Sequence, residues 1–134
     1  MKNFRQFITE EMSQFSGFLI SRDNMPQIKN VKDYVNFIER QGIRVDSGNM
    51  MVYMFRPTQI NFEQEKVDRI KADVGDDTST MTPIVVSEDG FVLDGHHRYF
   101  AAQQMDISIP VITVNLPINK LLKLTNEYLE YSDG

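Results

Sequence analysis

The feature that most constrains the fold is the junction at Asp94-Gly95, where a strand-like run meets a helix-forming run. Residues 83–93 contain two short apolar runs rich in β-branched residues, separated by Glu88-Asp89-Gly90, a pattern typical of a β-hairpin. Residues 99–105 are helix formers without Gly or Pro. We therefore expect the helix to follow the hairpin directly, with the Asp94 side chain capping its N-terminus.

The residues at this junction favour the binding of an anion. Gly95 has no Cβ and lets a turn or a ligand come close to the backbone, and the NH groups of a helix N-terminus attract negative charge. The guanidinium of Arg98 suits phosphate or carboxylate, while His96 and His97 add donors whose charge changes near neutral pH. Each residue alone has an ordinary structural explanation, but their convergence favours a ligand site.

A dedicated metal site is disfavoured by the same residues. Adjacent histidines on a helix point about 100° apart, whereas helical metal ligands use positions i and i+4. The chain has no Cys and no His-x-x-x-His motif to add ligands. Mg²⁺ that arrives with the phosphates of a nucleotide remains compatible with this sequence.

Several short motifs along the chain follow one another in a recognisable order. They are Arg56-Pro57-Thr58-Gln59, the helix-forming residues 65–70, Thr82-Pro83-Ile84-Val85-Val86, Asp94-Gly95-His96-His97-Arg98, Ala101-Ala102 and Ile109-Pro110-Val111. Together they resemble the ParB/sulfiredoxin superfamily, in particular the small ParB-like domains that phages often encode and that are often labelled ParB-like nucleases. The resemblance covers about residues 50–115.

The resemblance implies a compact α+β domain with a small mixed sheet, in which the DGHHR motif grips the phosphates of a nucleotide. Members of the superfamily hydrolyse CTP, use ATP to repair an over-oxidised cysteine, phosphorylate free serine or cleave DNA. The implied cofactors are ADP, ATP or CTP with Mg²⁺. For such a nucleotide, we expect His96 and His97 to be catalytic residues, of which one contacts the transferring or leaving oxygen. The residues implied in phosphate or nucleotide binding are Asp94, Gly95, His96, His97, Arg98, Arg56 and Gln59.

Departures from the superfamily pattern reduce the number of activities that this chain can have. Sulfiredoxins need a catalytic Cys, which this chain lacks, so their activity is excluded. The serine kinases carry a catalytic Glu at the position that aligns with Gln59, and Gln cannot act as a general base. A kinase would need Glu63 or Glu65 as its catalytic residue, although carboxylates in a solvated first helical turn have a simpler explanation in the helix dipole.

The distribution of charge bears on DNA as a partner. The chain has a formal net charge of −5, and residues 51–115 hold ten acidic and five basic residues. DNA-binding proteins usually carry a basic footprint, so DNA is disfavoured unless the fold assembles a local basic face. We therefore expect a nucleotide- or phosphate-binding protein that hydrolyses a nucleoside triphosphate or transfers a phosphoryl group to a small molecule. The alternatives are a ParB-like DNase and a non-catalytic interaction protein with a protein partner or a second copy, and whether the chain is an enzyme stays open.

The pattern of elements predicts a helical N-terminal extension at 1–49, a ParB/sulfiredoxin-like module at 50–115 and a closing helix at 116–134. Met25-Pro26-Gln27-Ile28 is expected to be a connector, with lining of the site as the less favoured alternative. The predicted elements are helices at 2–16 and 31–41, the latter ended by Gln41-Gly42, a first strand at 50–55, a helix at 62–73, an exposed loop at 74–80 and a strand at 107–115.

Composition also predicts where the chain resides. The absence of Cys is compatible with a reducing compartment. No apolar run approaches the length of a membrane span, and the first ten residues lack the apolar core of a signal peptide. We therefore expect a cytoplasmic protein, in the host cytoplasm for a phage-encoded chain, without a membrane partner.

Overall fold

The hairpin expected at residues 83–93 forms the centre of the structure, a computed structural model that describes residues 26–59, 62–75 and 77–133. Strand β3 (Ile84–Ser87) pairs antiparallel with β4 (Phe91–Asp94). Gly90 closes the connecting turn with a φ of +86°, a left-handed conformation that favours glycine. The turn signal in the sequence therefore identified the hairpin correctly.

Three further strands extend the hairpin into a mixed five-stranded sheet. Strand β5 (Ser108–Val114) runs parallel to β3 and antiparallel to β1 (Val45–Met51), and the short β2 (Arg56–Pro57) runs parallel to β4. The order across the sheet is β1-β5-β3-β4-β2. The small mixed sheet of an α+β domain is thus confirmed.

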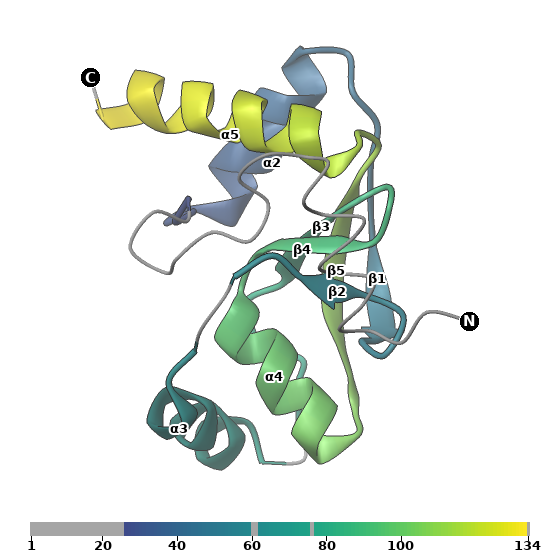
Figure 1. Cartoon of the computed structure of the whole chain (residues 1–134), viewed down its shortest axis with the longest axis vertical. Coiled ribbons are helices and arrows are strands. Elements are labelled where there is room, and N and C mark those ends of the chain that lie inside the picture. Colours follow the sequence, from purple (N-terminus) through teal and green to yellow (C-terminus); the bar gives the residue numbers. More distant parts are fainter. Residues whose placement is uncertain (1–25, 60–61, 76, 134) are drawn as a thin grey trace.

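Helices cover both faces of this sheet. Figure 1 shows α2 (Val31–Arg40) and α5 (Ile118–Asp133) together on one side, and α4 (His96–Met105) with α3 (Gln64–Val74) on the other. None of the helices among the described residues has both the length and the hydrophobicity to cross a membrane.

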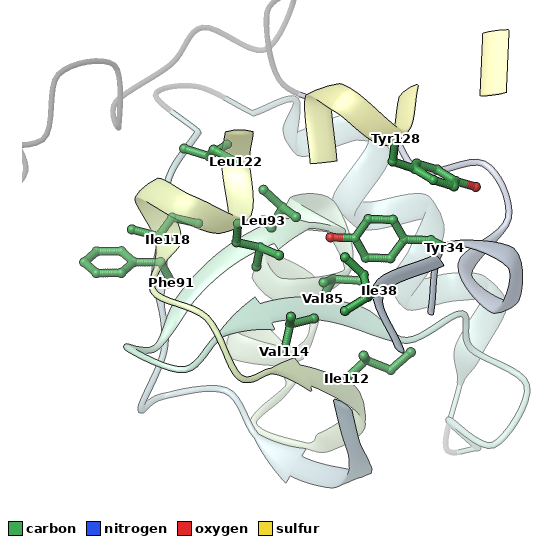
Figure 2. Close-up of a cluster of buried hydrophobic side chains, with 11 residues drawn as sticks. Tyr34, Ile38, Val85, Phe91, Leu93, Ile112, Val114, Ile118, Leu122 and Tyr128 are labelled. Carbon is green, nitrogen blue, oxygen red and sulfur yellow. The ribbon is translucent and has the colours of Figure 1, made fainter. Parts of the chain in front are cut away.

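The central strands supply residues to two separate hydrophobic cores. Successive side chains of a strand point to opposite faces, so Val85 faces α2 and α5 while its neighbours Ile84 and Val86 face α4. Strands β4 and β5 divide their side chains in the same way. Figure 2 shows the core beneath α2 and α5, in which Tyr34 and Tyr128 lie edge to face with ring centroids 5.2 Å apart. Both faces of β3 and β4 are therefore buried, which fixes the position of the turn that follows β4.

Most of the predicted elements are confirmed, and the first strand is the main correction. The helices predicted at 31–41 and 62–73 correspond to α2 and α3, and the predicted helix 2–16 lies outside the described residues. The strand predicted at 50–55 instead begins at Val45 and ends at Met51, so the predicted border between residues 49 and 50 falls within it. Residues 45–49 are mostly polar and exposed, and they adopt a strand because they pair at the sheet edge with β5.

Candidate functional site

A cavity of about 410 Å³ opens at the junction of β4 and α4. Three parts of the chain form its walls: the DGHHR motif with Gln59, one face of α3, and the segment before α2. The lining residues are Pro26, Gln27, Ile28, Gln59, Lys66, Arg69, Ile70, Asp73, Leu93, Asp94, Gly95, His96, His97 and Arg98. The five residues of the motif therefore lie around one space, as the sequence predicted.

Gly95 is the residue that turns the chain from β4 into α4. It is the N-cap of α4 with φ +90° and ψ +33°, in the left-handed region. A Cβ built there would lie 2.7 Å from Arg98 Nη2 and 2.8 Å from Ile84 Cγ2, so no larger residue fits without displacing them. The prediction that Asp94 caps the helix is wrong, because Gly95 occupies the N-cap and α4 has no side-chain capping hydrogen bond.

Asp94 connects two walls of the cavity instead. Its Oδ2 lies 3.3 Å from Arg98 Nη2, and its Oδ1 accepts a hydrogen bond from the Ile28 backbone NH at 3.4 Å. Burial raises the pKa of Asp94, and the positive charge of Arg98 opposes that rise only in part. The carboxylate thus ties the segment before α2 to the first turn of α4.

Arg98 lies partly inside the cavity wall, with 24% of its side chain exposed. Besides Asp94, its Nη2 donates to the Pro83 carbonyl at 3.3 Å. Its Nε is buried and has no hydrogen-bond partner within the described structure. A buried donor without a partner is costly, so an anion that reached this guanidinium would gain a charge-assisted contact.

His96 is buried and bonded within the protein. Its Nε2 lies 3.1 Å from the backbone NH groups of both Thr58 and Gln59, which donate to it. Burial, together with the nearby charges of His97 and Arg98, lowers the pKa of His96 to about 3. The ring is therefore neutral near pH 7, in contrast to the switchable donor expected from the sequence.

His97 lies one residue further along α4 and is half-buried. Its Nε2 accepts a hydrogen bond from the Glu63 backbone NH at 3.1 Å. The Glu63 carboxylate pairs with Lys66 at 3.8 Å, and that of Glu65 pairs with Arg69 at 3.9 Å. Neither Glu63 nor Glu65 is among the residues that line the cavity, in keeping with a solvated first turn of α3.

One face of α3 supplies cavity residues that lie outside the sequence motifs. Lys66, Arg69, Ile70 and Asp73 recur at the spacing of one helical face and all line the cavity. The ion pairs of Lys66 and Arg69 with glutamates are long and exposed, and such pairs are weak, so an anionic ligand can compete for both cations. The helical spacing was visible in the sequence, but nothing there indicated which face meets α4.

Two other predicted positions differ from expectation. Pro26, Gln27 and Ile28 line the cavity, so the preferred interpretation of this stretch as a plain connector is wrong and the less favoured one is confirmed. Arg56 does not line the cavity. It lies in β2, where its backbone NH donates to the Gly90 carbonyl, and its charge acts on the buried Tyr99 hydroxyl of α4.

Comparisons with known proteins add no identification to this geometry. The chain matches no protein-family model, and it has no significant match among curated proteins. Within the described residues, no group of three or more His, Cys, Asp or Glu side chains is arranged to hold a metal ion. The function therefore has to be argued from the cavity itself.

Proposed function

We propose that this chain binds the phosphate groups of a nucleotide in the cavity at the start of α4, as a small ParB/sulfiredoxin-like protein. The observation that carries the proposal is the meeting of Gly95 and the N-terminus of α4 with three cationic side chains, Arg98, Lys66 and Arg69, around one space. A helix N-terminus with nearby cations is suited to phosphate.

The local charge of the cavity supports an anionic ligand although the chain as a whole is acidic. Three cations line the cavity against two carboxylates, and one of these, Asp94, is already paired with Arg98. A phosphate at the start of α4 would accept hydrogen bonds from backbone NH groups and would interact favourably with the helix dipole. Lys66 and Arg69 approach from α3, so a chain of phosphates could contact both helices.

The size of the cavity favours a small molecule over duplex DNA. About 410 Å³ lies within the range of small-ligand sites, whereas DNA binding requires an extended basic surface. In this proposal the bound nucleotide is hydrolysed or transfers its phosphoryl group to a small molecule. A Mg²⁺ ion would arrive with the phosphates and neutralise their charge, and Asp73 and Asp94 are the carboxylates that line the same cavity.

Calorimetric titration with ADP, ATP, CTP and GTP, with and without Mg²⁺, tests the proposal. Arg98→Ala should weaken binding by about 1.5 to 3 kcal/mol, which is roughly ten- to 150-fold, through loss of a charge-assisted contact. Lys66→Ala is a second variant outside the hydrophobic core. Arg44→Ala is the matched control, because Arg44 is exposed, pairs with Asp46 and does not line the cavity.

The outcomes separate the candidate functions. Micromolar binding that is weakened in Arg98→Ala and Lys66→Ala but not in Arg44→Ala supports the nucleotide site. Absence of binding to all four nucleotides by the folded protein refutes it. A labelled DNA duplex is titrated in parallel. Binding of the duplex but of no nucleotide would favour the ParB-like DNase. Binding of neither would favour the non-catalytic interaction protein.

A further inference from the structure

Two consecutive histidines of the motif accept hydrogen bonds from backbone NH groups that lie more than 30 positions earlier in the chain. We propose that His96 and His97 are positioning residues: His96 holds Thr58 and Gln59, and His97 holds Glu63 at the start of α3, against the first turn of α4. We call this pair of histidines the di-histidine clamp. Its effect on ligand binding rests on the proposed function, whereas its geometry does not.

The bonding of His96 defines which ring nitrogen carries the proton. Nε2 lies 3.1 Å from the NH groups of Thr58 and of Gln59, and a backbone NH can only donate. Nε2 must therefore be unprotonated, so the proton of the neutral ring is on Nδ1. His96 is only 4% exposed, and the Thr58 hydroxyl beside its ring donates to the Val92 carbonyl at 2.7 Å. His96 thereby fixes Thr58 and Gln59, the two residues that follow β2.

The bonding of His97 acts on the start of α3. Its Nε2 accepts from the NH of Glu63, the N-cap residue of α3, whose own side chain makes no capping hydrogen bond. Glu63 immediately precedes the helix that carries Lys66 and Arg69. The clamp therefore sets where these two cations lie relative to Arg98 at the start of α4.

This bonding distinguishes positioning from acid–base catalysis. To take a proton from a substrate, Nε2 of His96 would have to give up two backbone hydrogen bonds inside a buried site. Leaving those two NH groups without an acceptor would be costly. His97 would likewise release the N-cap of α3. The geometry thus assigns both Nε2 atoms to the protein backbone and leaves the phosphate to the cations and to the start of α4.

Nuclear magnetic resonance of the ¹⁵N-labelled wild-type chain tests the clamp without any ligand. Long-range spectra of the imidazole rings should show His96 with Nε2 unprotonated and Nδ1 protonated. Couplings across N–H···N hydrogen bonds should connect the amides of Thr58 and Gln59 to His96 Nε2, and that of Glu63 to His97 Nε2. A proton on His96 Nε2, or the absence of all three couplings, would overturn the proposal.

Paired substitutions test the consequence for the site. Leu removes the acceptor, whereas Gln offers a carboxamide oxygen near the position of Nε2. In His96→Leu we expect amide exchange at Thr58 and Gln59 to accelerate at least about tenfold. In His97→Leu we expect the same at Glu63, with nucleotide affinity about tenfold weaker. The Gln variants should restore most of each loss, and Gln103→Leu, an exposed change on the same helix, should alter neither readout.

The two proposals fail in different ways. If the wild type binds no nucleotide, the proposed function fails, and the ring spectra and amide exchange still decide the clamp. If nucleotides bind but the Leu variants keep wild-type exchange and affinity, the clamp alone is refuted. If His96→Leu does not fold, the couplings in the wild type decide the role of His96.

Discussion

Gly95→Ala is the substitution whose cost the structure defines most closely. The backbone of Gly95 has φ +90°, and an added Cβ would lie 2.7 Å from Arg98 Nη2 and 2.8 Å from Ile84 Cγ2. The guanidinium is the end of a flexible side chain and can move aside. Ile84 is a fully buried, β-branched residue of β3, and it cannot move without disturbing the core.

The expected magnitude has two parts. A left-handed conformation costs a residue with a Cβ about 1 to 2 kcal/mol. Forcing a methyl group into an already packed site adds about 1 to 3 kcal/mol. Gly95→Ala should therefore lower the free energy of unfolding by about 2 to 5 kcal/mol.

Gly42→Ala supplies the matched control. Gly42 has a similar φ of +81°, but nothing lies within 4 Å of its added Cβ. It should therefore show only the conformational part, about 1 to 2 kcal/mol. Urea unfolding of both variants and of the wild type measures the difference, provided that the dependence on urea concentration is the same in all three.

The comparison also reports on the site. Displacement of the Arg98 guanidinium should weaken nucleotide binding in Gly95→Ala, while Gly42→Ala should bind as the wild type does. A Gly95→Ala variant no less stable than Gly42→Ala would refute the crowding argument at the start of α4.

Three further predictions concern stability. Because burial holds the folded-state pKa of His96 at about 3, below the ordinary value of 6.5, the unfolded chain takes up this proton first as the pH falls. The contribution of His96 to stability is thus fully present above pH 6.5 and is lost as the pH falls toward 3. By pH 5 the free energy of unfolding should have decreased by about 2 kcal/mol through this group. Urea titrations at pH 8 and pH 5 should show a smaller decrease in His96→Gln than in the wild type, and equal decreases would contradict this. Tyr34→Phe removes a hydroxyl that lies 2.7 Å from the Thr125 hydroxyl in the core, and it should lower the free energy of unfolding in urea by about 1 to 3 kcal/mol. Adding Thr125→Val to the same chain should recover part of this loss, because no unpaired hydroxyl then stays buried. If nothing is recovered, the unpaired Thr125 hydroxyl is not the cause of the loss. Asp89→Ala removes the carboxylate that accepts the Ile118 NH at the start of α5 at 3.1 Å and should cost about 0.5 to 2 kcal/mol, and an unchanged thermal midpoint would show that this cap contributes nothing.

The hairpin and the site turn could be predicted because their signals are local. Gly90 and Gly95 both adopt positive φ angles, a requirement that turn chemistry expresses within a few residues. The helix after Gly95 follows from a run of helix formers. The strand at residues 45–51 could not be predicted in the same way, because its polar residues are held by pairing with β5 rather than by their own propensity.

The candidate site was predicted only in part for the same reason. The motif located the start of α4, but it assigned to His96 and His97 a contact with a ligand, where the structure shows bonds to the backbone of a distant segment. Lys66 and Arg69 of α3 stand in the sequence, but no pattern there assigned them to the site. Their place depends on how α3 packs against α4.

The sequence by itself determined the order of most elements, the hairpin, and the glycine turn at which a phosphate is proposed to bind. These features follow from hydrophobic period and backbone conformation, which neighbouring residues specify. Only the tertiary structure decided that Ile28 bonds to Asp94 and that Glu63 bonds to His97, pairs separated by 66 and 34 positions. Such contacts depend on how the helices pack on the two faces of the sheet, and no local pattern specifies that packing.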